Sequence, residues 1–240
     1  KLYNNIIHIS LRKASMKKVI SDGFVEYVDH MGSDLSVVNA ARVSFASIST
    51  SWTDRDGKLL KYLWDHEHTS PFRHSSISFR IKAPIFVLRQ WMKHQVGCAW
   101  NEQSARYTEI KEGFYYPDHF RLQDTKNKQS SIGSLSDADE DQALILIEEV
   151  YSLAYANYQQ LLKMGVCREQ ARIVLPVATY SECIWTASTQ SIMHFLRLRL
   201  DESAQFEIRE YAQAIYDITM NIFPKTMELI QCNVLDANQK

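Results

Sequence analysis

The sequence predicts an α+β fold: a single domain over residues 1–240, with a small mixed or antiparallel sheet and several long helices. Apolar residues recur at helical spacing in several segments, whereas two-residue alternation is rare. The few expected strands do not alternate regularly with the helices, as they would in a doubly wound parallel sheet. A chain of 240 residues can form a core without disulfides or a metal ion, because folding removes roughly 70–75% of its surface from water.

Two helices are expected near the amino terminus. Asp34–Arg42 (DLSVVNAAR) and Gly57–His66 (GKLLKYLWDH) both carry apolar residues three and four positions apart. Asp34 can cap the first of these helices, because its carboxylate can accept a hydrogen bond from a free backbone N–H. Both helices should therefore bury one face.

A strand and a third helix follow. Over Ser76–Lys82 apolar and polar residues alternate strictly, which predicts a half-buried strand. Pro84 suits the first turn of the helix that comes next. On that otherwise apolar helix Gln90, Lys93 and His94 would share one face, since they are three and four positions apart.

A polar segment then interrupts the chain. Arg121–Ser136 is nearly free of aromatic residues, and it predicts a mobile loop over 121–136. Ser136 and Asp139 resemble a capping box at the start of a long helix. The apolar residues of that helix, from Leu144 to Leu161, indicate a face that packs in the core or at a subunit interface.

The last part of the chain returns to regular structure. A short segment ends at Pro176, and Val177–Ala187 is rich in β-branched and aromatic residues, which favours a strand. Ser188–Arg199 is expected to be helical. Asp201 and Glu202 are expected to start a further helix.

The composition excludes several classes of protein. The 7 glycines are widely spaced, so a Gly-rich phosphate-binding loop is absent and side chains must hold any phosphate. A net charge of −1 argues against a general nucleic-acid or membrane-surface protein. The 4 cysteines are far apart, which suits a reducing compartment. Because neither a signal peptide nor a long apolar run is visible, we expect a cytoplasmic protein.

Chemistry-bearing side chains are densest between Gln90 and Tyr107 (QWMKHQVGCAWNEQSARY). Glu102, Ser104 and Arg106 alternate, so in an extended segment they would project from one face. A carboxylate, a hydroxyl and a guanidinium together match the hydrogen-bonding edge of a nucleobase plus a phosphate. The alternative, which physics alone favours, is a solvated turn with a Glu102–Arg106 ion pair.

Two pairs of arginines are candidate anion ligands. Arg197 and Arg199 lie about 200° apart around a helix, so at most one of them faces a given pocket. Arg168 and Arg172 are neighbours four positions apart. Either one of these two holds an anion, or they form surface ion pairs with Glu169 or another acid.

A metal centre and a cysteine nucleophile are weaker hypotheses. His66, His68 and His74 straddle an expected helix end and a loop, without the spacing of a zinc motif, so no metal site is assigned. Cys98 lies near His94, but a lone cysteine usually packs as a small apolar residue.

Five segments, spread over most of the chain, resemble flavin-dependent thymidylate synthases. They are NAARVSF (Asn39–Phe45), HTSPFRHSSISFRIKAPIFVLRQW (His68–Trp91), NEQSARY (Asn101–Tyr107), ARIVLP (Ala171–Pro176) and FLRLRLDESAQFEIR (Phe195–Arg209). The resemblance implies conversion of dUMP to dTMP, with methylenetetrahydrofolate as one-carbon donor and FAD reduced by NADPH as hydride carrier. It also implies a homotetramer whose active sites combine residues from several subunits.

The resemblance assigns site residues by position. Arg199, which would stabilise the N3 anion of the uracil, and Ser104, which would lie near the base, are the implied catalytic residues. The implied dUMP-binding residues are Gln90, Lys93, Glu102, Gln103, Ser104, Arg106, Arg172 and Arg199. The implied FAD contacts are His74, Ser76, Lys93, His94, Gln95, Val96, Glu102, Ser188, Gln190 and His194.

The flavin side departs from the family pattern. Lys93-His94-Gln95, followed by eight residues and then Ser104, stands where the family has Arg-His-Arg, seven residues and then Ser. Ser188-Thr189-Gln190 replaces Asn-x-Arg, and His194 replaces an Asn. Two alternatives to methylation therefore stay open: hydroxymethylation of dUMP in the same pocket, and a non-catalytic nucleotide-binding protein with impaired flavin binding.

Overall fold

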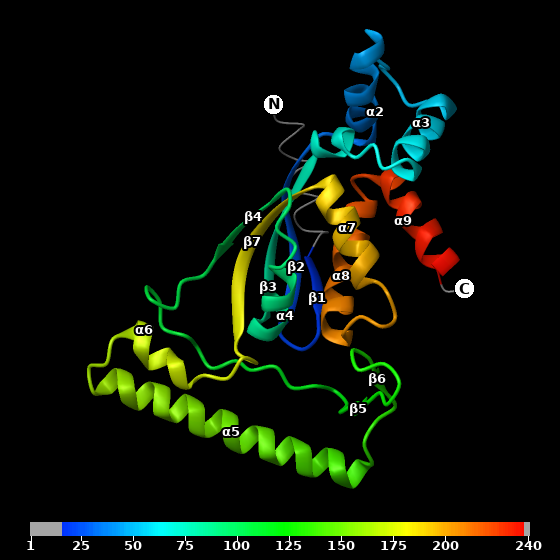
Figure 1. Ribbon diagram of the computed structural model, residues 1–240. Coiled ribbons are helices and arrows are strands. Elements are labelled where there is room, and N and C mark those ends of the chain that lie inside the picture. The colour runs from blue at the N-terminus through cyan, green and yellow to red at the C-terminus, as the bar shows by residue number, and fades with distance from the viewer. Residues whose placement is uncertain (1–15, 238–240) are drawn as a thin grey trace.

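The computed structural model describes residues 16–237, with side chains up to residue 230. Its centre is a sheet with the strand order β1-β2-β3-β7-β4, in which every neighbouring pair is antiparallel. Helices α4, α7 and α8 pack against this sheet, and the long helix α5 lies apart from them (Figure 1). The predicted α+β class with an antiparallel sheet is confirmed. The segment in which no signal peptide was found, residues 1–15, lies outside the described residues.

The elements have the following bounds. The strands are β1 Met16–Val19, β2 Gly23–Met31, β3 Ser76–Pro84, β4 Cys98–Glu102, β5 Leu122–Gln123, β6 Ser131–Ile132 and β7 Tyr180–Ser188. The α-helices are α2 Asp34–Arg42, α3 Asp54–Asp65, α4 Ile85–Trp91, α5 Asp137–Lys163, α6 Arg168–Ala171, α7 Thr189–Arg199, α8 Phe206–Met220 and α9 Pro224–Ala237. Short 3₁₀ helices are η1 Val43–Phe45, η2 Ser70–Arg73 and η3 Arg172–Val174.

The core lies between the sheet and its helices. The alternation predicted for β3 is present, since Ile77, Phe79 and Ile81 are fully buried. Next to them the rings of Trp91 and Phe195 stack with centroids 4.7 Å apart, a contact that adds to their hydrophobic burial. The end of α4 is therefore fixed against α7, and this contact positions the residues that follow α4.

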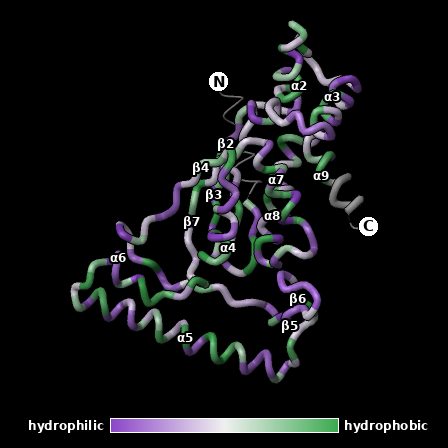
Figure 2. The backbone as a smooth tube through the Cα atoms, in the orientation of Figure 1, coloured by the Kyte–Doolittle hydropathy of each residue, from purple (hydrophilic) through white to green (hydrophobic). Residues whose placement is uncertain are grey.

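Helix α5 packs on a second, smaller apolar cluster. Tyr151 and Tyr158 are buried on its inner face, and Tyr151 donates a hydrogen bond to the carbonyl of Tyr115 at 3.0 Å. Along the helix hydrophobic and hydrophilic residues alternate in short runs (Figure 2). A second set of apolar side chains on α5 is exposed: Ile145, Leu146, Val150 and Leu153. One face of α5 thus packs within the chain, and another exposes apolar side chains.

Several predicted boundaries are corrected. Helix α2 has the predicted bounds, but Ser33 caps it instead of Asp34, whose carboxylate accepts hydrogen bonds from the backbone N–H groups of Lys225 and Thr226. Helix α3 begins three residues earlier than predicted, because Thr53 and Asp56 form a capping box. Helix α4 ends at Trp91, so Lys93 and His94 lie in the turn after it, and the predicted shared helix face with Gln90 is wrong.

The last part of the chain differs in several boundaries. Strand β7 begins at Tyr180 instead of Val177 and extends to Ser188, which caps α7 instead of lying within it. Asp201 does not start a helix: its carboxylate accepts hydrogen bonds from the backbone and hydroxyl of Ser203 in a separate turn, and α8 begins at Phe206. The segment 121–136 contains the β5–β6 hairpin, and its base is tied down by an Arg121–Glu207 ion pair of 2.6 Å. Its mobility stays a prediction. Each helix within residues 16–237 is too short or too polar to cross a bilayer.

Candidate functional site

The sequence-predicted nucleotide residues fall into two groups within one chain. The first group lines a cavity of about 700 Å³ beyond the end of β4. Its members are Glu102, Gln103, Ser104, Arg106 and Arg172. The second group comes from α4, from the turn that follows it and from the end of α7. Its members are Gln90, Lys93, His94 and Arg199.

In the first group the chain turns where the sequence predicted an extended face. Strand β4 ends at Glu102, whose Oε1 accepts a hydrogen bond from the Ser181 hydroxyl at 2.7 Å. Ser104 Oγ accepts from the backbone N–H of Arg106 at 3.3 Å, and its carbonyl accepts from Tyr107 at 3.0 Å. The prediction that Glu102, Ser104 and Arg106 project from one extended face is therefore wrong, because Ser104 begins a turn.

The alternative ion pair between Glu102 and Arg106 is not formed either. Arg106 Nε binds Glu169 Oε2 at 3.0 Å, with both side chains about half exposed. Arg168 lies 3.7 Å from Glu109 instead of pairing with Glu169. Arg172 is exposed in the cavity wall and has no acidic partner within the described residues. This group thus presents guanidinium groups that an anion can reach.

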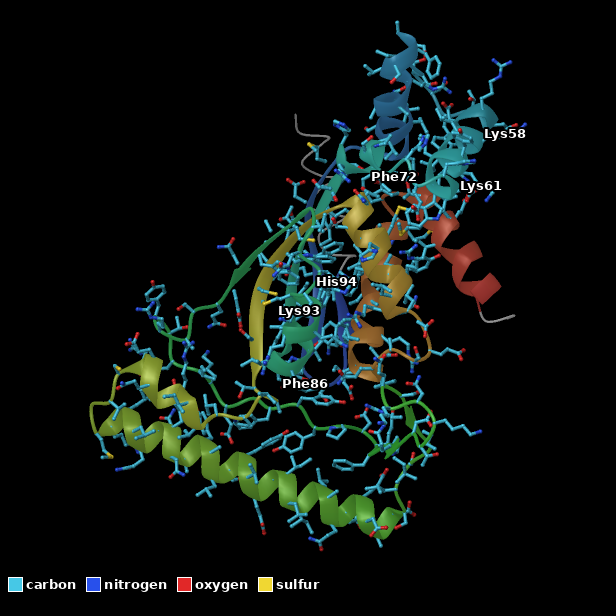
Figure 3. All side chains as sticks on the ribbon, in the orientation of Figure 1. Lys58, Lys61, Phe72, Phe86, Lys93 and His94 are labelled. Atoms are coloured by element: carbon cyan, nitrogen blue, oxygen red, sulfur yellow. The ribbon has the colours of Figure 1, made fainter. Side chains whose placement is uncertain are left out.

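The second group is organised around His94 and Arg199. Figure 3 labels Lys93 and His94 in the segment that follows α4. Arg199 Nε donates a hydrogen bond to His94 Nε2 at 3.1 Å, and the His94 ring lies edge-on to Phe195 with centroids 5.2 Å apart. Burial, Arg199 and then His194 lower the pKa of His94 to about 4. His94 is therefore neutral near pH 7, which leaves the positive charge of Arg199 uncompensated.

Neighbouring residues complete this group. Gln90 Oε1 is buried without a hydrogen-bond partner, which marks a position for a donor from a ligand. The carbonyl of Val96 accepts a hydrogen bond from Ser191 Oγ at 2.5 Å. Gly97 has φ +69°, and a Cβ atom there would lie 2.5 Å from Ser191 Oγ, so the turn requires glycine. Lys93 and Gln95 are exposed.

The remaining implied flavin contacts lie next to Gly97, at the end of β3 and β7 that is opposite to the first group. Ser76 and Ser188 are paired in register, and Ser188 caps α7. His74 lines a second cavity, of about 970 Å³, between η1, α3 and η2. Arg73 lines the same cavity and donates from Nε to Gln190 Oε1 at 2.5 Å. His194 is exposed on α7, with its ring centroid 5.9 Å from that of His94.

Sequence reasoning missed Arg73, although it lies in the segment HTSPFRH that carried the resemblance. The cavity around it is basic: it contains the exposed side chains of Arg55, Arg73, His68 and His74, against one acid, Glu67. This lining fits a ligand that carries phosphate or carboxylate groups.

The surroundings of His66, His68 and Cys98 bear on the two weaker hypotheses. The ring of His66 stacks on Tyr62 with centroids 4.1 Å apart, and His68 lies edge-on to Tyr62. Within the described residues no three His, Cys, Asp or Glu side chains gather as metal ligands would. Burial raises the pKa of the Cys98 thiol, which disfavours its nucleophilic thiolate form.

Comparisons with known proteins agree on one family. Residues 26–225 match the family described as thymidylate synthase complementing protein. The flavin-dependent thymidylate synthase of Thermosipho africanus is 44% identical over 211 residues, 88% of this chain and 92% of the relative. A flavin-dependent thymidylate synthase of Thermus thermophilus is 44% identical over 219 residues, 91% of this chain and 79% of the relative. A crystal structure of the UMP/dUMP methylase PolB from Streptomyces cacaoi bound with 5-Br dUMP is similar with a TM-score of 0.80 and 36% identity, covering 90% of this chain and 97% of that one.

Proposed function

Because the chain belongs to the flavin-dependent thymidylate synthase family, we propose that it is a methyltransferase that converts dUMP to dTMP by methylation at C5. In this proposal methylenetetrahydrofolate donates the one-carbon unit, and FAD reduced by NADPH carries the hydride. A cytoplasmic location accompanies this proposal as a prediction.

The observation that carries the proposal is the state of Arg199. Its guanidinium is half-buried, and within the described residues it has a neutral hydrogen-bond partner and no carboxylate. A fixed positive charge beside a weakly acidic imide favours the ionised imide. Loss of the N3 proton from uracil raises the electron density at C5, which then attacks the one-carbon unit. Arg199 would therefore activate the substrate without a covalent nucleophile on the protein.

The residues present fit a flavin dinucleotide. The basic cavity around Arg73 suits its phosphates, and the buried, unpartnered Gln90 Oε1 lies close in sequence to the implied contacts Lys93, His94 and Gln95. Ser188 and Gln190 at the start of α7 would join these two parts. When bound, the flavin supplies the hydride that reduces the one-carbon unit to a methyl group.

Two subunits would complete each site. Within the described part of one chain, no hydrogen bond or ion pair joins the group around Glu102 and Arg172 to the group around His94 and Arg199. In this proposal a second copy of the chain supplies one of the two groups to each substrate. The exposed apolar side chains of α5 support the same conclusion. We propose the homotetramer that the family resemblance implies.

Subunit mixing tests the shared site. Arg199→Ala and Arg172→Ala variants, each inactive alone, should regain activity when mixed, dissociated and reassembled. If each site takes one group from each of two subunits, random assembly should restore about a quarter of the sites. Activity that stays absent in the mixture, while an affinity tag on one variant co-purifies the other, would contradict a shared site.

Turnover assays separate methylation from its rivals. The purified protein should bind FAD, and its reduced flavin should be oxidised only when dUMP and methylenetetrahydrofolate are both present. Mass spectrometry should identify dTMP as the product. A product heavier by one oxygen would instead indicate hydroxymethylation. Binding of dUMP without FAD binding or turnover would indicate a non-catalytic nucleotide-binding protein.

UMP is a second candidate substrate. The structural relative named above is a UMP/dUMP methylase, and a second structure of it was solved with 5-Br UMP, with a TM-score of 0.80 and 35% identity to this chain. Binding constants for dUMP and UMP, measured side by side, decide whether the ribose 2′-hydroxyl is tolerated here.

A further inference from the structure

The partner of Arg199 differs in charge from the partners of two other partly buried arginines. Arg42 and Arg121 have side chains less than a third exposed, and each binds a buried carboxylate at 2.6 Å, that of Asp56 or of Glu207. These ion pairs hold the fold together, and they also neutralise the guanidinium groups. Arg199 is half-buried but has no acidic partner within residues 16–230. Within these residues its charge therefore stays available to a ligand.

The hydrogen bond between Arg199 and His94 fixes the state of the imidazole. An arginine side chain can only donate, so His94 Nε2 must present its lone pair at 3.1 Å. The ring is then neutral, with its proton on Nδ1. The edge-on contacts with Phe195 and His194 hold the ring in this orientation. The low pKa of His94 agrees with this neutral form.

A neutral hydrogen-bond acceptor preserves the positive charge of Arg199, whereas a carboxylate would not. The hydrogen bond at Nε orients the planar guanidinium and leaves its two terminal nitrogens free to donate. A carboxylate would orient the group equally well, but it would cancel the charge that polarises an anionic ligand. The residue type at position 94 therefore matters as much as the presence of an acceptor.

We propose that His94 is a positioning residue, whose neutral Nε2 orients Arg199 toward the substrate without neutralising it. The inference rests on the proposed function, in which Arg199 binds the uracil. It adds a role for His94 that is independent of any contact with the flavin.

Substitutions at position 94 separate orientation from charge. His94→Gln places an amide oxygen near the position of Nε2 and keeps a neutral acceptor. His94→Leu removes the acceptor. His94→Glu keeps an acceptor but adds a negative charge. The binding constant for dUMP is measured by calorimetry on each purified oligomer, with flavin content read from the absorbance spectrum. Arg199→Ala is the reference for full loss, and Arg197→Ala, which removes an exposed charge from the same helix, is the matched control.

The expected order is specific. His94→Gln should bind dUMP within about threefold of the unmodified protein, and His94→Leu should bind at least about tenfold more weakly, as expected for a lost hydrogen bond to a charged group. His94→Glu should lose as much affinity as Arg199→Ala, while Arg197→Ala should bind normally. In turnover assays His94→Gln should restore most of the kcat that His94→Leu loses.

Three results would overturn the proposal or its premise. Equal dUMP affinity of His94→Leu and the unmodified protein, with Arg199→Ala impaired, would refute the positioning role and leave the proposed function intact. Normal binding by His94→Glu would refute the requirement for a neutral acceptor. Normal binding by Arg199→Ala itself would remove Arg199 from the substrate site, and the proposed function would fail at that point.

Discussion

Replacement of Asp56 by asparagine should lower the free energy of unfolding by about 3 kcal/mol. The Asp56 side chain is completely buried at the start of α3. Its Oδ1 accepts hydrogen bonds from Arg42 Nε at 3.2 Å, Arg42 Nη2 at 2.6 Å and Ser49 Oγ at 3.0 Å. Its Oδ2 accepts from the backbone and hydroxyl of Thr53 at 2.8 and 2.6 Å. One carboxylate thus joins α2, the loop after η1 and the cap of α3.

The expected loss of stability follows from the hydrogen bonds that an asparagine side chain cannot accept. Its side chain has one oxygen, so in either orientation the amide N–H₂ faces Arg42 or the backbone N–H of Thr53, which are both donors. The charge of Arg42 also loses its partner. Removal of one member of a buried ion pair costs about 3–5 kcal/mol, and we expect the lower end because water can reach part of Arg42. Arg42 is 23% exposed.

The effect should depend on pH. Burial alone would raise the pKa of Asp56, but the hydrogen bonds from Thr53, Arg42 and Ser49 outweigh it and lower the pKa from 3.8 to about 2. Since the pKa is lower in the folded state, the carboxylate stabilises the fold above pH 4, and this contribution is lost as the pH falls toward 2. The difference between the unmodified protein and Asp56→Asn should therefore shrink below pH 4.

Urea denaturation followed by tryptophan fluorescence, at pH 7 and at pH 3 and at one protein concentration, measures both quantities. Asp54→Asn is the matched control, because Asp54 is exposed in the same turn of α3. It should change stability by less than about 0.5 kcal/mol. A loss below about 1 kcal/mol for Asp56→Asn, or a difference that does not change with pH, would refute this role of the carboxylate.

Three further predictions concern the site and its supports. Glu207→Gln should lower the free energy of unfolding by about 2–3 kcal/mol and speed proteolysis within 121–136, because the buried carboxylate binds Arg121 at 2.6 Å. An unchanged rate of cleavage would contradict this prediction. Gly97→Ala should lower both the stability and the FAD affinity, since the added Cβ has no room and φ is +69°. A thermal melt measures the stability and flavin fluorescence measures the affinity, and an unchanged melting temperature would refute the steric argument. Arg73→Ala should weaken FAD binding about tenfold, while Gln190, its hydrogen-bond partner, stays in place; normal affinity would remove Arg73 from the cofactor site.

The sequence predicted those elements whose signals are local. Helix α2 has its apolar stripe within nine residues, and β3 shows its alternation without interruption. Strands β1 and β2 were missed, because β1 reads MKKV and β2 carries charged residues on its open face. Strand β1 pairs with β2, and β2 pairs with β3, whose paired residues lie 45 or more positions further along the chain. A local sequence pattern does not show such a distant partner.

The site was harder to predict for the same reason. The end of α4 at Trp91 is marked by neither glycine nor proline, and contacts of His94 with Phe195 and Arg199 hold the chain in the turn. Arg106 meets Glu169, which is 63 positions away. The sequence named the candidate residues, but partners this distant follow from the packing of the sheet and helices.

The arginines of this chain can be ordered by how available their charge is to a ligand. Arg42 and Arg121 bind buried carboxylates, and this use of their charge supports the fold. Arg106 binds an exposed glutamate, a pair worth well under about 1 kcal/mol that a phosphate can displace. Arg172 has no acidic partner within the described residues, and Arg199 is oriented by a neutral imidazole. In a chain whose few glycines are too scattered to build a phosphate-binding loop, this gradation explains how the same residue type can stabilise the protein and still bind an anionic nucleotide.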